Sequence, residues 1–172
     1  MRNRLARAGV YSGMKIFLVP VDFSAVSEEI VDTAVSFARS FGGKVILLHI
    51  VQPPIITSEY ALPVDAVQES MSTSEKTAVS KLAVYAETFR MAGLEAGIAV
   101  RHGPPVYEIL DAAAKAGADF ILMGSHGHGK IYDLLVGSTA SGVLKGAHCG
   151  VIIMPSVGKA GKVTPAPHLA GV

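Results

Sequence analysis

The chain has 172 residues, of which 50% are hydrophobic and 17% charged, and its formal net charge is +1 at pH 7. This length fits one domain, and the near-neutral charge indicates neither a nucleic-acid partner nor an acidic surface as partner. The one cysteine, Cys149, excludes an internal disulfide and fits a reducing, cytoplasmic compartment. No apolar run approaches the roughly 18 residues of a membrane-spanning helix, so we expect no membrane partner.

The two ends of the chain differ in composition from its middle. Residues 1–13 are basic but lack the apolar segment of about 7–15 residues that a signal peptide carries. Met14 stands directly before the first strand pattern and is a candidate start. Residues 157–172 are rich in Gly, Pro and Ala without periodicity. We therefore expect a disordered N-terminal extension, one domain over residues 14–156, and a flexible C-terminal tail.

Short apolar segments alternate with amphipathic segments along this domain. The apolar segments are rich in β-branched residues, which is typical of strands buried on both faces of a parallel sheet. The amphipathic segments carry apolar residues at helical spacing and are bounded by serine, proline or glycine. In chain order we expect a strand over 15–21, a helix over 24–40, strand 45–51, helix 65–92, strand 97–101, helix 105–116, strand 119–123, a helical turn over 130–135, helix 138–146 and strand 151–154.

This alternation predicts the α/β fold class, with a single doubly wound, five-stranded parallel sheet. Right-handed crossovers leave few topologies, and the commonest has strand order 3-2-1-4-5, a Rossmann-like arrangement. The order reverses between strands 1 and 4, and ligands in such sheets bind beyond the carboxyl ends of the strands at that point. The two loops expected there are residues 20–24 and the glycine-rich loop that follows residue 123.

The glycine-rich loop contains the stretch GSHGHGKI, which is similar to the phosphate-binding pattern G-x-x-x-x-G-K-[ST]. Gly124, Gly129 and Lys130 fit that pattern. Ile131, however, stands where a hydroxyl should bind magnesium, and the loop follows the fourth strand instead of opening the domain. A true P-loop is therefore disfavoured.

A metal site on the same loop is a second hypothesis. His126 and His128 lie one residue apart and could bind zinc, but a zinc site needs a third ligand and a second shell of hydrogen bonds. No cluster of Cys, Asp or Glu in the sequence supplies that ligand. We therefore expect no metal ligands on the protein.

A third interpretation extends beyond the octapeptide. Gly124, Gly127 and Gly137 form the pattern G-x2-G-x9-G-[ST] with Ser138, and Thr139 follows. Glycines let the backbone approach a ribose and phosphates closely, and a helix that starts at Ser138 offers free N–H groups to phosphate. Spaced glycines alone are a weak signal, because Gly137 could simply begin a capped helix. The combination of strand, loop, fixed gap, capped helix and switch point favours a phosphate site.

The domain resembles the universal stress protein family, specifically its ATP-binding branch, over residues 14–156. The stretch KIFLVPVDFS resembles the family's first strand and its P-x-D-x-S turn. KVILLHIVQPP and CGVIIMP resemble the second and last strands. DFILMGSHGHGKIYDLLVGSTASGVL contains the branch's G-x2-G-x9-G-[ST] motif without a gap. The resemblance implies an adenine nucleotide alpha hydrolase-like fold.

The resemblance also implies one pocket for ATP, with magnesium or manganese bound through the phosphates and no catalytic residue. The family usually carries proline where Gly150 stands, and this departure is expected to loosen the start of the last strand. The residues with implied roles are Pro20, Val21, Asp22 and Ile50 at the adenine, Met123, Gly124 and Gly127 at the ribose and phosphates, and Gly137, Ser138 and Thr139 on the phosphate chain.

The resulting hypothesis is an ATP-binding regulatory or stress-survival protein. The alternative is an ATP-hydrolysing or nucleotidyl-transfer enzyme on the same fold, and at most slow hydrolysis is expected because no general base stands out beside the phosphates. A pure interaction module is disfavoured by the intact motif. The apolar strand over 151–154 lies at the sheet edge and invites antiparallel pairing, so we expect a homodimer, with a regulatory protein partner that the sequence does not identify.

Overall fold

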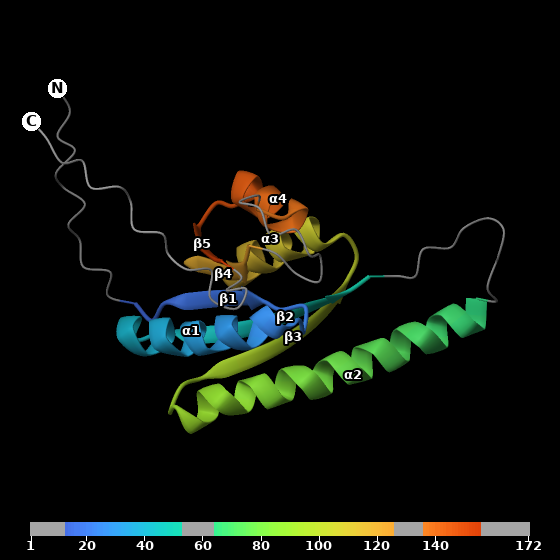
Figure 1. The fold of residues 1–172 in the computed structure, drawn as a ribbon, viewed down its shortest axis with the longest axis horizontal. Coiled ribbons are helices and arrows are strands. Elements are labelled where there is room, and N and C mark those ends of the chain that lie inside the picture. The colour runs from blue at the N-terminus through green and yellow to red at the C-terminus, as the bar shows by residue number, and fades with distance from the viewer. Residues whose placement is uncertain (1–12, 53–63, 126–135, 156–172) are drawn as a thin grey trace, which may run out of the picture.

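The computed structural model describes residues 13–52, 64–125 and 136–155 (Figure 1). Strands and helices alternate through these residues, as predicted, and each boundary lies within one residue of the expected one. The helical turn expected over 130–135 lies outside the described residues. The elements are β1 (Ile16–Pro20), α1 (Ala25–Phe41), β2 (Lys44–Val51), α2 (Val64–Met91), β3 (Ala96–His102), α3 (Pro105–Ala116), β4 (Phe120–Gly124), α4 (Ser138–Gly146) and β5 (Gly150–Met154).

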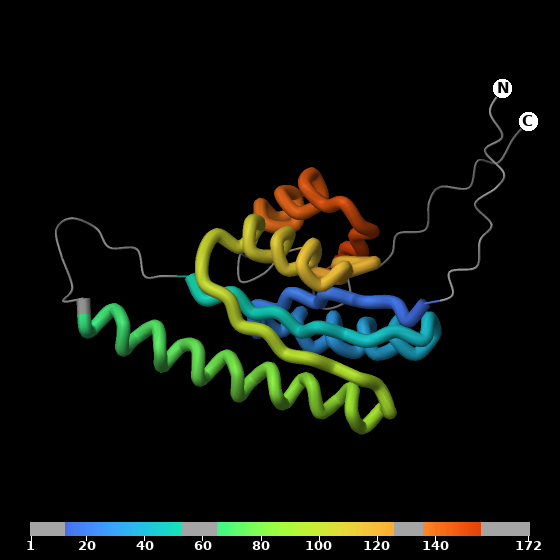
Figure 2. Tube along the Cα trace, turned by 180° about the vertical axis from the view of Figure 1, so that it is seen from behind, coloured from blue at the N-terminus to red at the C-terminus, as the bar shows by residue number. Residues whose placement is uncertain are grey.

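The five strands form one sheet in the order β3-β2-β1-β4-β5, and every neighbouring pair is parallel. The predicted fold class and strand order are therefore confirmed. Helices α1 and α2 cover one face of the sheet and α3 and α4 cover the other (Figures 1 and 2). No helix in the described part of the chain is both long and apolar enough to cross a membrane.

The hydrophobic core consists of two layers, one on each face of the sheet, and β1 contributes side chains to both. Side chains alternate along a strand, so Phe17 and Val19 pack toward α1 and α2 while Leu18 packs toward α3 and α4. All three side chains are fully buried. Leu82 and Phe89 of α2 complete the first layer. The high hydrophobicity of the sequence is thus explained by a central sheet with helices on both sides.

A carboxylate fixes β1 against β4 at the amino end of the sheet. The two oxygens of Asp119 accept hydrogen bonds from the Ile16 N–H and the Lys15 ammonium group, each at 3.0 Å. The Asp119 N–H in turn donates to the Ile16 carbonyl at 2.9 Å. These contacts stabilise the charged carboxylate and so lower the pKa of Asp119 below its ordinary value. The hydrogen bond from the Ile16 N–H has the largest effect on this pKa, followed by the one from Lys15.

Helix α2 extends past the sheet, as both views of the chain show (Figures 1 and 2). Between residues 65 and 77 its side chains are mostly exposed, and full burial begins at Ala78. From there the helix packs against β2 and β3. The second half of α2 therefore carries its tertiary contacts, and this half includes Lys81 and Tyr85, which lie near the end of β1.

Gly150 permits close packing at the start of β5, where the sequence led us to expect a looser strand. A Cβ atom at this position would lie 2.5 Å from Cδ1 of Phe120. The Phe120 ring itself stacks on Phe17, with ring centroids 5.4 Å apart, so it has little room to move. The Gly150 N–H also donates to the Asp119 carbonyl at 3.0 Å. The expected loosening is therefore wrong, because the missing side chain lets two strands and an aromatic stack meet closely.

We predict that Gly150→Ala lowers the free energy of unfolding by about 1–3 kcal/mol, the usual cost of overpacking a core. The matched control is Gly97→Ala in β3, where an added Cβ meets nothing within 4 Å. The control should change stability by no more than about 0.5 kcal/mol. Urea unfolding of both variants measures the difference, and equal midpoints would contradict the packing argument.

Candidate functional site

The carboxyl ends of β1 and β4 lie side by side at the point where the strand order reverses. Ser125 follows β4 directly, and its N–H donates to the Met154 carbonyl at 2.7 Å. The Ser125 carbonyl accepts a hydrogen bond from the Gly137 N–H at 2.8 Å. This second bond brings the start of α4 back to the end of β4. The two segments predicted to form one site, around Asp22 and around Gly137, are thus attached to adjacent strands.

Asp22 organises the turn that follows β1. Its Oδ1 accepts hydrogen bonds from the Ser24 N–H and the Ser27 hydroxyl, each at 3.0 Å. Ser27 is fully buried, so the carboxylate anchors the first turn of α1 to the end of the strand. Ser24 stands at the N-cap position, as expected, but its hydroxyl makes no capping bond. That oxygen is buried and has no hydrogen-bond partner in the described part of the chain.

Phe23 has an unusual backbone conformation in the same turn. Its φ is +62°, and among the described residues it is the only one other than glycine with a positive φ. Bulky residues rarely adopt this region because Cβ crowds the carbonyl oxygen, at a cost of roughly 1–2 kcal/mol. The Phe23 ring packs on the His49 ring, with centroids 4.3 Å apart. Backbone strain at a ligand-binding edge is a common feature of functional sites.

His49 connects β2 to this turn. Its Nδ1 lies 2.8 Å from the Val21 carbonyl oxygen, which can only accept, so the ring carries a proton on Nδ1 and donates it. Burial lowers the pKa of His49 below its ordinary value, while the Val21 hydrogen bond and the charge of Asp22 oppose that shift. The ring is therefore neutral at pH 7.

The other residues predicted for the adenine wall lie around the same strand ends. The Val21 N–H donates to the Leu48 carbonyl at 2.8 Å, which extends the ladder between β1 and β2 by one residue. Val21 and Met123 are both buried, each with 6% of the residue exposed. Pro20 and Ile50 are half-buried, and Ile50 packs on the face covered by α3 and α4.

The start of α4 has the features of an anion-binding helix end. Gly137 occupies the N-cap position, and Ser138 and Thr139 are the first helical residues. Ser138 is exposed and Thr139 half-buried. The first N–H groups of a helix have no partner within the helix, and its dipole is positive at that end. No acidic side chain stands in the first turn of α4 to occupy these groups.

The predicted site is only partly covered by the structure. Gly127, His126, His128 and the P-loop-like residues Lys130 and Ile131 lie outside the described residues. Within residues 13–52, 64–125 and 136–155, no group of three His, Cys, Asp or Glu side chains is placed to bind a metal ion.

The profile of the Universal stress protein family matches residues 13–155. The chain belongs to the universal stress protein family. It is 30% identical over 156 residues to Universal stress protein MJ0531 of Methanocaldococcus jannaschii, a match that covers 88% of each chain.

Solved structures of this family share the fold. The structure of MJ0577 from the same organism superposes with a TM-score of 0.72 at 27% identity, over 82% of this chain and 95% of that one. A universal stress protein of Archaeoglobus fulgidus in complex with dAMP superposes with a TM-score of 0.55 at 21% identity, over 82% of this chain and 97% of that one. The second likeness shows the fold alone.

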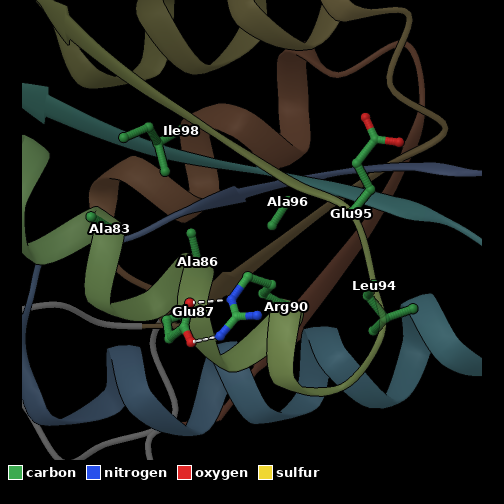
Figure 3. Close-up of a pocket in the computed structure, with 8 residues that line it drawn as sticks. All are labelled: Ala83, Ala86, Glu87, Arg90, Leu94, Glu95, Ala96 and Ile98. Atoms are coloured by element: carbon green, nitrogen blue, oxygen red, sulfur yellow. Dashed lines mark hydrogen bonds and ion pairs between the residues drawn. The ribbon is translucent and has the colours of Figure 1, made fainter.

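A hollow elsewhere on this universal stress protein fold lies away from the strand ends described above. It measures about 450 Å³ and is formed by the last turns of α2 and the amino end of β3 (Figure 3). Alanine side chains line it, and Arg90 at its rim is paired with Glu87, with Nε 2.6 Å from Oε2. The charges of Arg90 and Glu87 are thus paired with each other, and the hollow lies at the opposite end of the strands from Asp22.

Sequence reasoning predicted Asp22 and Gly137 as site residues but did not name the residues that hold the turn. Phe23 and His49 are 26 positions apart, and Lys81 and Tyr85 come from a helix further along the chain. Only one signal pointed to them, a single histidine inside the apolar run VILLHIV. A polar side chain in such a run needs a partner, and here the partner is the Val21 carbonyl.

We predict that Asp22→Ala and Ser24→Ala have different effects on stability. Asp22→Ala leaves the Ser24 N–H and the buried Ser27 hydroxyl without their acceptor, which should cost about 1–3 kcal/mol. Ser24→Ala removes a hydroxyl that makes no bond, so the usual loss of about 1 kcal/mol for an N-cap serine should be absent. Urea unfolding of the two variants checks this. If Ser24→Ala is as destabilising as Asp22→Ala, then the hydrogen bonds to Asp22 are not what anchors the start of α1.

Proposed function

We propose that the protein binds ATP and acts as a nucleotide-dependent regulatory or stress-survival protein. One observation carries this proposal: the Gly137 N–H bonds to the Ser125 carbonyl at 2.8 Å, which sets the start of α4 beside the carboxyl end of β4. The turn with Asp22 lies on the neighbouring strand. Binding at this position agrees with the general rule for doubly wound sheets.

The turn after β1 is the proposed adenine end of the site. The Ser24 N–H and the Ser27 hydroxyl donate to Asp22 and orient its carboxylate, whose oxygens are the acceptors that the adenine amino group requires. Pro20, Val21 and Ile50 supply apolar surface and backbone groups beside it. Support comes from the resemblance of the P-x-D-x-S turn to that of the family.

The phosphate end is proposed at the glycine motif. Gly124 and Gly127 would let the backbone approach the ribose and phosphates, with Met123 beside them. Gly137, Ser138 and Thr139 would bind the phosphate chain through N–H groups and hydroxyls at the positive end of α4. Mg²⁺ or Mn²⁺ would be held by phosphate oxygens and water, because Mg²⁺ commonly keeps several waters and binds substrate phosphates.

Binding with little or no turnover is the proposed mode. A general base must lie within hydrogen-bond reach of the attacking water. His49 donates its Nδ1 proton to the protein backbone and lies on the sheet face of α1 and α2, away from α4. It is therefore poorly placed to activate a water at the phosphates. A cytoplasmic location and an unidentified protein partner complete the proposed role.

We predict that ATP binds with micromolar affinity and that Gly127→Val weakens binding at least about tenfold, or ~1.4 kcal/mol. The valine side chain would occupy the space that the phosphates need. The control is Gly97→Val on the exposed surface of β3, where an added Cβ meets no neighbour within 4 Å. Isothermal titration calorimetry gives both affinities. Equal ATP binding by the Gly127→Val variant and the parent would contradict the proposed site.

We also propose a homodimer formed through β5. This strand pairs only with β4 among the described strands, and Ile152 and Met154 are partly buried apolar residues on it. An apolar edge strand exposes unpaired backbone groups, and antiparallel pairing of two copies closes both edges with two-fold symmetry.

Backbone groups of Gly150 and Met154 bond to the β4 side, so by alternation the N–H of Ile153 faces the open edge. Ile153→Pro should therefore convert the dimer to a monomer, because proline has no N–H to donate across that edge. Ile98→Pro in β3, at the opposite edge of the sheet, serves as the matched control and should leave the dimer intact. Light scattering at tens of micromolar measures the mass. A parent chain that is monomeric there, or a dimeric Ile153→Pro variant, would exclude β5 as the interface.

A further inference from the structure

The conformation of the turn after β1 is held in place by contacts between aromatic rings. Phe23 adopts a φ of +62°, which phenylalanine avoids in the absence of a compensating contact. Its ring lies near His49 of β2, at 4.3 Å between centroids, and near Tyr85 of α2, at 6.1 Å. The Lys81 ammonium group stands 5.0 Å from the centroid of the same ring. Two elements far apart in the chain therefore fix one side chain of the turn.

His49 contacts the turn at two points on either side of Asp22. Its ring face packs on Phe23, and its Nδ1 donates to the Val21 carbonyl at 2.8 Å. The peptide unit before Asp22 and the side chain after it are both restrained by one imidazole. The carboxylate between them is oriented further by the Ser24 N–H and the Ser27 hydroxyl.

Simple core packing does not account for this arrangement. A turn that only closed the core could place glycine at position 23, where a positive φ carries no steric cost. The adjacent Ser24 hydroxyl is also buried without a hydrogen-bond partner in the described part of the chain. Two neighbouring residues thus have unfavourable features, the backbone conformation of Phe23 and the buried hydroxyl of Ser24. Such features persist only where many surrounding contacts hold the residues in place.

We propose that Phe23 and His49 are positioning residues of the nucleotide site, which hold Asp22 in its base-reading orientation before nucleotide arrives. The inference rests on the proposed function. A pre-formed turn raises the apparent affinity for nucleotide, because almost all of the protein is already in the conformation that binds. It also gives specificity, since a fixed carboxylate accepts from the adenine amino group and repels the guanine carbonyl at the same place.

Two variants separate this role from general packing. Phe23→Gly accepts a φ of +62° freely but also many other conformations, and it removes the ring contacts with His49 and Tyr85. His49→Phe keeps an aromatic ring against Phe23 but loses the donor to the Val21 carbonyl. His102→Phe is the control, because His102 lies at the end of β3, where its Nε2 is 3.3 Å from Glu75. If Phe23→Gly does not fold, His49→Phe still tests the proposal.

The first measurement uses no nucleotide. Hydrogen exchange of the Ser24 N–H, followed by NMR, reports whether its bond to Asp22 stays formed. We expect the Ser24 N–H to exchange about tenfold faster in both variants than in the parent. This rate corresponds to a tenfold fall in the ratio of closed to open forms of the turn. The control should exchange at the parent rate.

The second measurement is the affinity for ATP and for GTP by calorimetry. Both variants should bind ATP more weakly than the parent, by a factor no larger than the change in exchange rate, and the ratio of ATP to GTP affinity should fall toward one. Loss of overall stability alone would weaken both nucleotides equally and leave that ratio unchanged. The control should keep the affinity and the ratio of the parent.

The outcomes distinguish the two levels of the hypothesis. A parent chain that binds no ATP overturns the proposed function and the base-reading role. The exchange rates of the Ser24 N–H then decide only whether the ring contacts of Phe23 hold the turn. A parent that binds ATP, with variants that keep its affinity ratio and its Ser24 exchange rate, overturns the positioning role alone. An unchanged affinity ratio despite faster exchange also overturns it, because Asp22 then does not read the base.

Discussion

The burial of β1 on both faces is the constraint on which the rest of this structure depends. Its central side chains are fully buried, and it pairs in parallel with β2 on one side and β4 on the other. No residue of this strand can therefore shift register without moving both layers of the core. The chain must leave the sheet after Pro20 at a fixed place, and the segment after β4 must leave beside it. The candidate site is the consequence of these two adjacent exits.

The two ends of the sheet differ in how well their local interactions are satisfied. At the amino end, Asp119 is bonded through both carboxylate oxygens, and Gly150 permits a close-packed aromatic stack. At the carboxyl end, Phe23 has a costly backbone conformation and the Ser24 hydroxyl is buried without a partner in the described residues. Stability is concentrated at one end and local strain at the other. This division is common in proteins that use one end of a parallel sheet for binding.

The sequence predicted those features that depend on periodicity and on local turn chemistry. Alternating apolar runs gave the strands, glycines at 42 and 117 stopped helices, and both adopt left-handed conformations with φ near +60° (63° and 61°). The order of strands followed from handedness rules and is confirmed. The placement of Gly137 beside the end of β4 was anticipated from the glycine spacing, and its hydrogen bond to Ser125 agrees with it.

Features that depend on contacts between distant segments were not accessible from the sequence. The sequence around Phe23 does not indicate a positive φ. The ring contact that offsets the cost of this conformation is made by His49, which lies on another strand. Gly150 was interpreted as a loosening substitution, since the Phe120 ring that fills its space is 30 positions away. A serine was expected to bound α1, and Ser24 does occupy the N-cap position, but its hydroxyl makes no capping bond and the side chain of Asp22 accepts from its N–H. In each case the deciding partner was set by the fold.

The most direct test of this account is an NMR titration of the isotope-labelled protein with Mg-ATP, which follows every backbone amide at once. The account predicts that the shifts concentrate at residues 21–24 and 137–139, the two segments at the carboxyl ends of β1 and β4. Shifts confined to residues 94–98, beside the hollow at the amino end of β3, or no shifts at millimolar ATP, would contradict it.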